Sequence, residues 1–148
     1  MRFATYDRQF WAGAKCGLDE VQSRVTGLPT VRTLIVRDQD MQGVVGRGTF
    51  LNDLLQIAGG ENVLQQAGWP EIDKEQLLAT KPDVILHLLP GASDTVVANA
   101  KAAWSTMPLP EATRQRVYVL TDWYLLQGGV HVAETARNFA TRLHPPTK

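Results

Sequence analysis

The fold is decided by residues 44–90, VVGRGTFLNDLLQIAGGENVLQQAGWPEIDKEQLLATKPDVILHLLP. The stretch opens with a glycine-containing loop, residues 46–49, in which two glycines permit a tight turn from a strand into a helix. Apolar residues then recur at helical spacing over residues 50–58, and Thr49 stands where a helix N-cap is expected. Two glycines at positions 59 and 60 predict the end of this helix.

The second half of this stretch predicts a short helix followed by a buried strand. Asp73 and Gln76 have the spacing of a capping box, and Pro82 disfavours helical backbone at the residue before it. Residues 84–89 are apolar except for His87, a pattern that is typical of a strand covered on both faces. We interpret His87 as a packed histidine because it stands inside this strand.

The rest of the chain alternates further strands and helices. An amphipathic helix is predicted over residues 5–26, with apolar residues three and four positions apart. The remaining elements expected in order are a strand at 31–36, a helix from Ser93 through Trp104, a rigid linker at 107–110, a strand at 117–120, a loop at 121–127 and a final helix marked by Val132, Ala136, Phe139 and Leu143.

This order predicts an α/β fold with three layers, in which a mostly parallel sheet has helices on both faces. Ligands of such sheets collect beyond the carboxyl ends of the strands. Three loops follow predicted strands at that edge: residues 37–48, 90–94 and 121–127. We expect them to lie together although they are far apart in the sequence.

Composition excludes several classes of partner. The chain has 148 residues, with 15 basic and 15 acidic side chains and therefore no net charge. No cluster of lysine or arginine stands out, so we expect no nucleic-acid partner. Cys16 is the single cysteine, which rules out an intramolecular disulfide. Asp7, Arg8 and Lys15 interrupt the first fifteen residues, so we expect no secretory signal in this sequence.

Three ordered blocks carry a resemblance to a known family: GRGTFLNDLLQIAGGENVL, WPEIDKEQLLATKPDVIL and RVYVLTDWYLLQGGVHVAETARNFATRL. Together they resemble the C-terminal lobe of the class III periplasmic substrate-binding proteins of ABC importers, which carry vitamin B12, haem and ferric siderophores. The resemblance spans roughly residues 20–145. The segments WPEIDKEQLL and LTDWY resemble the vitamin B12-binding group most.

The resemblance implies an organisation and a role for the chain. Residues 1–28 would correspond to the end of the helix that joins two lobes, residues 29–148 to the C-terminal lobe, and the N-terminal lobe would be absent. The expected function is to bind a corrinoid such as vitamin B12, outside the cytoplasm, and to dock on an ABC permease in the membrane. A separate N-terminal lobe is a further expected partner, and no enzymatic activity is expected.

The resemblance also indicates ligand-binding residues. Trp69 matches a position at which the vitamin B12-binding group contacts the corrinoid, although composition alone favours a hydrophobic lid over the helix of Leu77. Asp122 matches an aspartate that faces the ligand, and its alternative role is that of a turn residue. Trp123 and Tyr124 are candidates for the same rim.

Three other residues are candidates with different roles. Met41 would be a soft ligand contact in a loop, residues 38–42, where the vitamin B12-binding group carries aromatic residues. Arg47 would donate to an anionic ligand at the rim. Glu75 matches the acidic residue through which the family docks on its permease, with the helix dipole as the alternative reason for a glutamate there. Leu126 stands where the group has a basic residue, so haem and ferric siderophores remain alternative ligands.

Two hypotheses from other classes remain open. One is a small nucleotide- or phosphate-using α/β enzyme built on residues 46–49, although this loop lacks the Lys-Ser/Thr ending of a P-loop. The other is an orphan scaffold without a ligand. His131 and His144 have no partner at metal-ligand spacing, so we predict no metal site and no cofactor, and a bound ligand would bring its own cobalt or iron.

Overall fold

A sheet of four parallel strands forms the centre of the computed structural model, which describes residues 15–127 and 131–145. The strands lie in the spatial order β2 (Gly60–Asn62), β1 (Val31–Val36), β3 (Val84–Leu88) and β4 (Val117–Leu120). The alternation of strands and helices in the sequence predicted such a sheet, and the prediction is confirmed.

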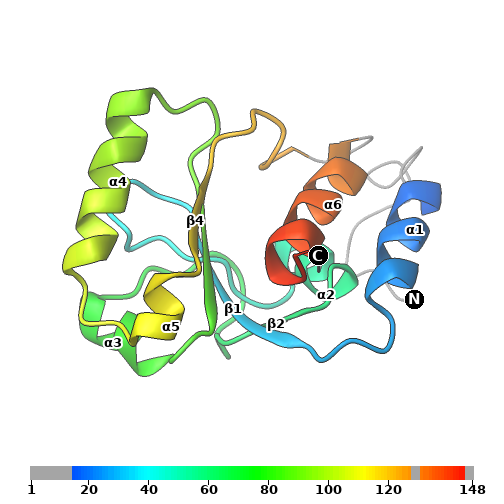
Figure 1. Ribbon diagram of the computed structural model, residues 1–148, viewed down its shortest axis with the longest axis horizontal. Helices are drawn as coiled ribbons and strands as arrows, with labels where there is room; N and C mark the ends of the chain where they lie inside the picture. The colour runs from blue at the N-terminus through cyan, green and yellow to red at the C-terminus, as the bar shows by residue number, and fades with distance from the viewer. Residues whose placement is uncertain (1–14, 128–130, 146–148) are drawn as a thin grey trace.

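Helices cover both faces of the sheet, as Figure 1 shows. One face carries α1 (Lys15–Val25), α2 (Phe50–Ile57) and α6 (Val132–Leu143), and α6 packs on both α1 and α2. The other face carries α3 (Lys74–Ala79), α4 (Asp94–Thr106) and α5 (Glu111–Arg114). The predicted three-layer α/β architecture is therefore correct.

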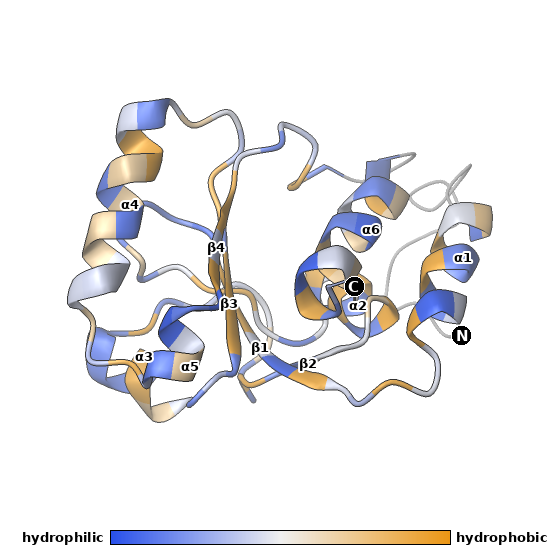
Figure 2. Ribbon diagram, viewed as in Figure 1, coloured by the Kyte–Doolittle hydropathy of each residue, from blue (hydrophilic) through white to orange (hydrophobic). Residues whose placement is uncertain are grey.

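The two faces of the sheet enclose separate hydrophobic clusters. Successive side chains of a strand point to opposite faces, so Ile35 and Leu86 join the cluster on the α6 side, whereas Leu34 and Ile85 join the cluster on the α4 side. All five residues of β3 are buried. Figure 2 shows these strands as largely hydrophobic between helices that carry many hydrophilic residues.

The predicted helix starts are confirmed by their hydrogen bonds. The Thr49 hydroxyl accepts from the Asn52 amide at 3.1 Å, which caps α2. Asp73 and Gln76 form both bonds of the predicted capping box at the start of α3. Ser93 caps α4 through the Val96 amide at 3.3 Å.

Two short elements were not predicted, and one prediction is only partly covered. Strand β2 begins at Gly60, where a Cβ would come within 2.4 Å of Leu55, so glycine lets the strand approach α2 closely. Helix α5 follows Pro110, and its four residues are too few to show a helical period. The helix predicted over residues 5–26 is present from Lys15 to Val25, and its first ten residues lie outside the described part of the chain.

Candidate functional site

The loops that follow the strands meet at the carboxyl edge of the sheet. The ring of His87 in β3 lies with Nε2 2.7 Å from the Asp38 carbonyl in the loop after β1. The Leu89 amide donates to Leu120 at 2.8 Å, which ties the loop after β3 to the end of β4. The Gly91 amide also donates to the Thr121 carbonyl at 2.8 Å, so the loops at 90–94 and 121–127 are adjacent, and the loop at 37–48 meets the same edge through Asp38, as predicted.

A fourth segment, residues 66–72, joins this edge, and its pairing there was not predicted. The loop after β1 pairs with residues 66–72 through backbone bonds, including Gly46 to Gly68 at 2.8 Å and Val44 to Pro70 at 3.0 Å. A Cβ on Gly46 would lie 2.4 Å from the Gln66 carbonyl oxygen, so only glycine allows this pairing. The paired loops place Trp69 beside the ends of the strands.

Trp69 is held by its backbone and open at its side chain. Its carbonyl accepts from Arg37 Nη2 at 3.0 Å, and Arg37 follows β1 directly. The indole lies 6.1 Å from the ring of Phe50 at an angle of 55°, and 43% of the residue is exposed. The indole is thus supported on one side by α2 and available to a ligand on the other.

A second aromatic group follows β4. Trp123 is 58% exposed, and its ring packs edge-on against those of Tyr124 at 5.9 Å and His131 at 4.7 Å. Asp122 Oδ2 accepts from Asn138 Nδ2 at 2.6 Å, which fixes the carboxylate against α6. Its other oxygen has lone pairs that a ligand amide can use. Asn138 was missed, because a residue about two turns into a helix carries no local sign of a loop partner.

Met41 and Arg47 have structural partners of their own. Met41 is half-buried with a φ of 63°, and its amide donates to the Asp38 carbonyl at 3.1 Å. Arg47 donates from Nε to Leu64 O at 2.8 Å and from Nη2 to Asn62 O at 3.1 Å. These bonds leave other N–H groups of the guanidinium for a ligand, so its role as a rim donor stays a prediction.

Glu75 lies on the exposed surface of the first turn of α3. The amide of Ile72 donates to the Gln42 carbonyl at 2.9 Å, which attaches the start of α3 to the loop after β1. The segment that leads into the Glu75 helix is therefore bonded to the loop that carries Met41. Docking on a permease stays a prediction for this residue.

His87 is fully buried, as its interpretation as a packed histidine requires. Its Nδ1 lies 2.9 Å from Trp104 Nε1, and the two rings meet edge-on. Burial lowers the pKa of His87, because a charged imidazolium loses its hydration there, and the Asp38 carbonyl and nearby carboxylates oppose this effect.

The residues after β1 do not form a phosphate loop of the P-loop kind. The Thr49 hydroxyl donates to the Gly46 carbonyl at 3.0 Å while it caps α2, and the Gly46 amide donates to Gly68. Both groups have protein partners. In residues 15–127 and 131–145, no three histidine, cysteine, aspartate or glutamate side chains are placed to hold a metal ion, and no helix is long and apolar enough to cross a membrane.

A polar groove runs beside the second aromatic group. It has a volume of about 330 Å³ and lies along α6, next to the loop after β4. Its lining consists of Tyr124, Glu134, Arg137, Asn138, Thr141 and Arg142. The groove therefore contains two arginines beside Asn138, the residue that bonds Asp122.

Comparison with known proteins shows similarity to binding proteins, among them several of ABC transporters. A vitamin B12-binding protein of Pectobacterium atrosepticum is 30% identical over 84 residues, which make up 55% of this chain and 28% of that protein. An ABC transporter substrate-binding protein from Listeria monocytogenes superposes with a TM-score of 0.73 at 24% identity, over 88% of this chain and 54% of that structure. No family model matches the chain.

Two further similar structures are of proteins that bind a known ligand. The periplasmic vitamin B12 binding protein of Vibrio cholerae gives a TM-score of 0.70 at 18% identity, covering 87% of this chain and 50% of that structure. A periplasmic haem-binding protein from Roseiflexus gives 0.63 at 20% identity, covering 92% and 53%. The chain has the fold of a class III periplasmic binding protein lobe. The resemblance seen in the sequence is confirmed, and this lobe spans about half the length of the structures it matches.

Proposed function

We propose that this lobe is the C-terminal, ligand-binding lobe of an ABC-importer substrate-binding protein and that it binds a corrinoid such as vitamin B12. The sequence match to a vitamin B12-binding protein is the observation that carries the choice of ligand. The lobe would capture the ligand at the carboxyl edge of its sheet and perform no chemistry on it. The proteins it matches are binding proteins rather than enzymes.

The geometry of the edge supports a large, flat ligand. Trp69 is attached to the end of β1 and Trp123 follows β4, and β3 lies between these strands. Two strand spacings, about 10 Å, separate the ends of β1 and β4, and both indoles are exposed. Aromatic rings so placed can cover the face of a macrocycle at little cost in side-chain entropy. Asp122 would then accept a hydrogen bond from a peripheral amide of the corrin.

Haem or a ferric siderophore is the second candidate ligand. The match to a haem-binding protein favours it, as do the departures at Met41 and Leu126 from the vitamin B12-binding pattern. Met41 is half-buried beside Asp38, so it offers only part of its thioether to a ligand. Leu126 offers no charge to a phosphate or carboxylate.

Delivery of the ligand requires a partner in the membrane. Glu75 would pair with arginines of the permease, and its place in the first turn of α3 leaves the carboxylate exposed for that contact. Helix α1 would belong to the connection between this lobe and an N-terminal lobe. With these partners the protein would act outside the cytoplasm.

A tryptophan-fluorescence titration tests the proposal with cyanocobalamin, haemin and a ferric hydroxamate, corrected for the absorption of each ligand. We expect saturable quenching by cyanocobalamin, weakened about 2- to 10-fold in Trp69→Ala and in Trp123→Ala, since aromatic contacts of this kind contribute about 0.5–1.5 kcal/mol. Leu28→Ala is the matched control, because this exposed apolar residue precedes β1 at the opposite edge.

Three other outcomes of the titration would contradict parts of the proposal. Saturation by haemin or the hydroxamate alone would replace the corrinoid with the second candidate. Equal weakening by Leu28→Ala would show that the effect does not arise at the proposed edge. No saturable binding of any of the three ligands up to about millimolar concentration would reject the binding function for this lobe.

A further inference from the structure

The side chain of His87 joins three elements beneath the candidate site. It belongs to β3, its Nε2 lies 2.7 Å from the Asp38 carbonyl, and its Nδ1 lies 2.9 Å from Trp104 Nε1 in α4. An indole nitrogen can only donate, so Nδ1 must be the acceptor. The proton of the neutral ring is therefore on Nε2, where it is donated to Asp38.

The Asp38 carbonyl is the anchor of the loop that carries Met41. It accepts both from His87 and from the Met41 amide, and Gln42 completes the turn by donating its amide to Asp40 Oδ1 at 3.1 Å. The Gln42 carbonyl accepts from Ile72 at the start of α3. The loop bonded to His87 thus also supports the segment that follows Trp69.

The surroundings of the ring leave no partner for a second proton. The charged groups that act on His87 are Asp38 and Asp40 of the loop, and the Asp38 carboxylate is paired with Arg37 at 3.2 Å. Its neighbours in register on β1 and β4 are the uncharged Val36 and Val119, and α4 presents the Trp104 indole. A proton on Nδ1 would face the N–H of that indole, so protonation must break this hydrogen bond.

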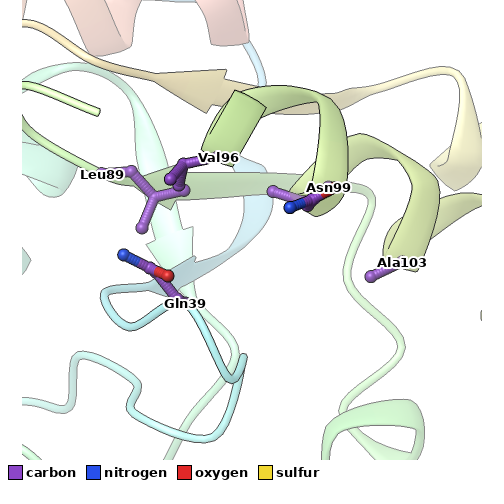
Figure 3. A pocket seen from close by; sticks show the side chains of 6 residues that line it. Gln39, Leu89, Val96, Asn99 and Ala103 are labelled. Atoms are coloured by element: carbon purple, nitrogen blue, oxygen red, sulfur yellow. The ribbon is translucent and has the colours of Figure 1, made fainter. Parts of the chain in front are cut away.

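A small cavity beside the loop provides space for rearrangement. It has a volume of about 90 Å³ and lies between the loop after β1 and α4. Figure 3 shows its lining, which consists of Gln39, Leu89, Val96, Asn99, Ala100 and Ala103. The volume is enough for several water molecules, and the two carboxamides offer them hydrogen bonds.

We propose that His87 is a pH-sensitive latch, in which protonation of Nδ1 separates β3 from Trp104 and releases residues 38–42 from the carboxyl edge of the sheet. The lowered pKa of the buried ring agrees with this arrangement, since it favours the neutral imidazole, in which both ring nitrogens are hydrogen-bonded. The latch itself is independent of any ligand. Its effect on ligand capture rests on the function proposed above, because Met41 and the Trp69 segment lie on the released side.

The sign of the pH dependence follows from the direction of the shift. A histidine whose pKa is lower in the folded state than in the unfolded state stabilises the fold above the unfolded pKa, about 6.5, and this stability is lost as the pH falls. The folding equilibrium constant should fall about tenfold for each pH unit below 6.5 until the folded state also takes up the proton.

Urea unfolding between pH 5 and 8 tests the latch by comparing the wild type with His87→Gln. Glutamine offers one donor and one acceptor but no titratable proton, so we expect the tenfold-per-unit loss to disappear in this variant. The two proteins share every other ionisable side chain. Parallel curves for the two proteins would overturn the proposal.

Nitrogen NMR of histidine-labelled wild-type protein provides a readout that does not depend on a variant folding. We expect His87 to carry its proton on Nε2 at pH 7.5 and to titrate below the ordinary range, together with a shift of the Trp104 indole N–H signal. A proton on Nδ1, or titration without a response from Trp104, would refute the latch. Because neither measurement uses a ligand, the latch and the proposed binding function can fail separately.

Discussion

Replacement of Asn62 should cost more stability than any other single polar change near the site. The residue is 2% exposed at the end of β2. Its Nδ2 donates to Val45 O at 2.9 Å and to Asn52 Oδ1 at 3.1 Å, and its Oδ1 accepts from the Leu64 amide at 3.0 Å. Asn62→Ala removes three hydrogen bonds worth about 1 kcal/mol each and leaves their partners buried, so we expect a loss of about 3 kcal/mol.

Urea denaturation followed by circular dichroism measures this change, with Glu61→Ala as the matched control. Glu61 is the exposed neighbour of Asn62 in β2, and its replacement should shift the free energy of unfolding by less than about 0.5 kcal/mol. Asn62→Asp keeps the acceptor for Leu64 but sets an oxygen against the Val45 carbonyl, so it should cost at least as much as alanine. A loss below about 1 kcal/mol in Asn62→Ala would refute the reasoning.

Two further changes test the local structure around the candidate site. Gly46→Ala should destabilise the protein more than Gly48→Ala, since a Cβ at position 46 would lie 2.4 Å from the Gln66 carbonyl oxygen. Position 48 has open space, so alanine there costs only its left-handed backbone conformation, about 1–2 kcal/mol. Thermal unfolding of both variants measures the difference, and the reverse order would contradict the close approach at Gly46. Asp73→Ala should lose about 0.5–2 kcal/mol of unfolding free energy with the cap of α3, and Lys74→Ala, one position on, should lose almost none.

The elements of this fold that could be predicted are those whose signals are local. Thr49, Asp73 and Ser93 each bond an amide three residues later, so a cap can be recognised within one turn of sequence. The apolar run of β3 likewise predicts from its own residues that the strand is buried. Strand β2 was not predicted, because its three residues are recognised by their pairing with β1 rather than by a hydrophobic pattern of their own.

The candidate site could be predicted only at the level of its loops. The rule that ligands collect at the carboxyl ends of parallel strands correctly brought the three loops together. The partners that orient the site are distant in sequence: Asn138 is 16 residues from Asp122, and Arg37 is 32 residues from Trp69. Such pairs depend on the packing of whole elements, and no spacing within a single segment reveals them.

Under the proposed function, the affinity of this lobe alone measures how much of the binding free energy comes from one side of the ligand-binding cleft. A nanomolar complex corresponds to about −12 kcal/mol, and half of that value corresponds to a Kd of roughly 30 µM. Trp69 and Trp123 can cover only the side of a ligand that faces the sheet edge. A Kd for cyanocobalamin in the tens of micromolar would therefore fit one half of a shared site, whereas a nanomolar Kd would mean that this edge, with its aromatic rings and Asp122, already forms the complete site.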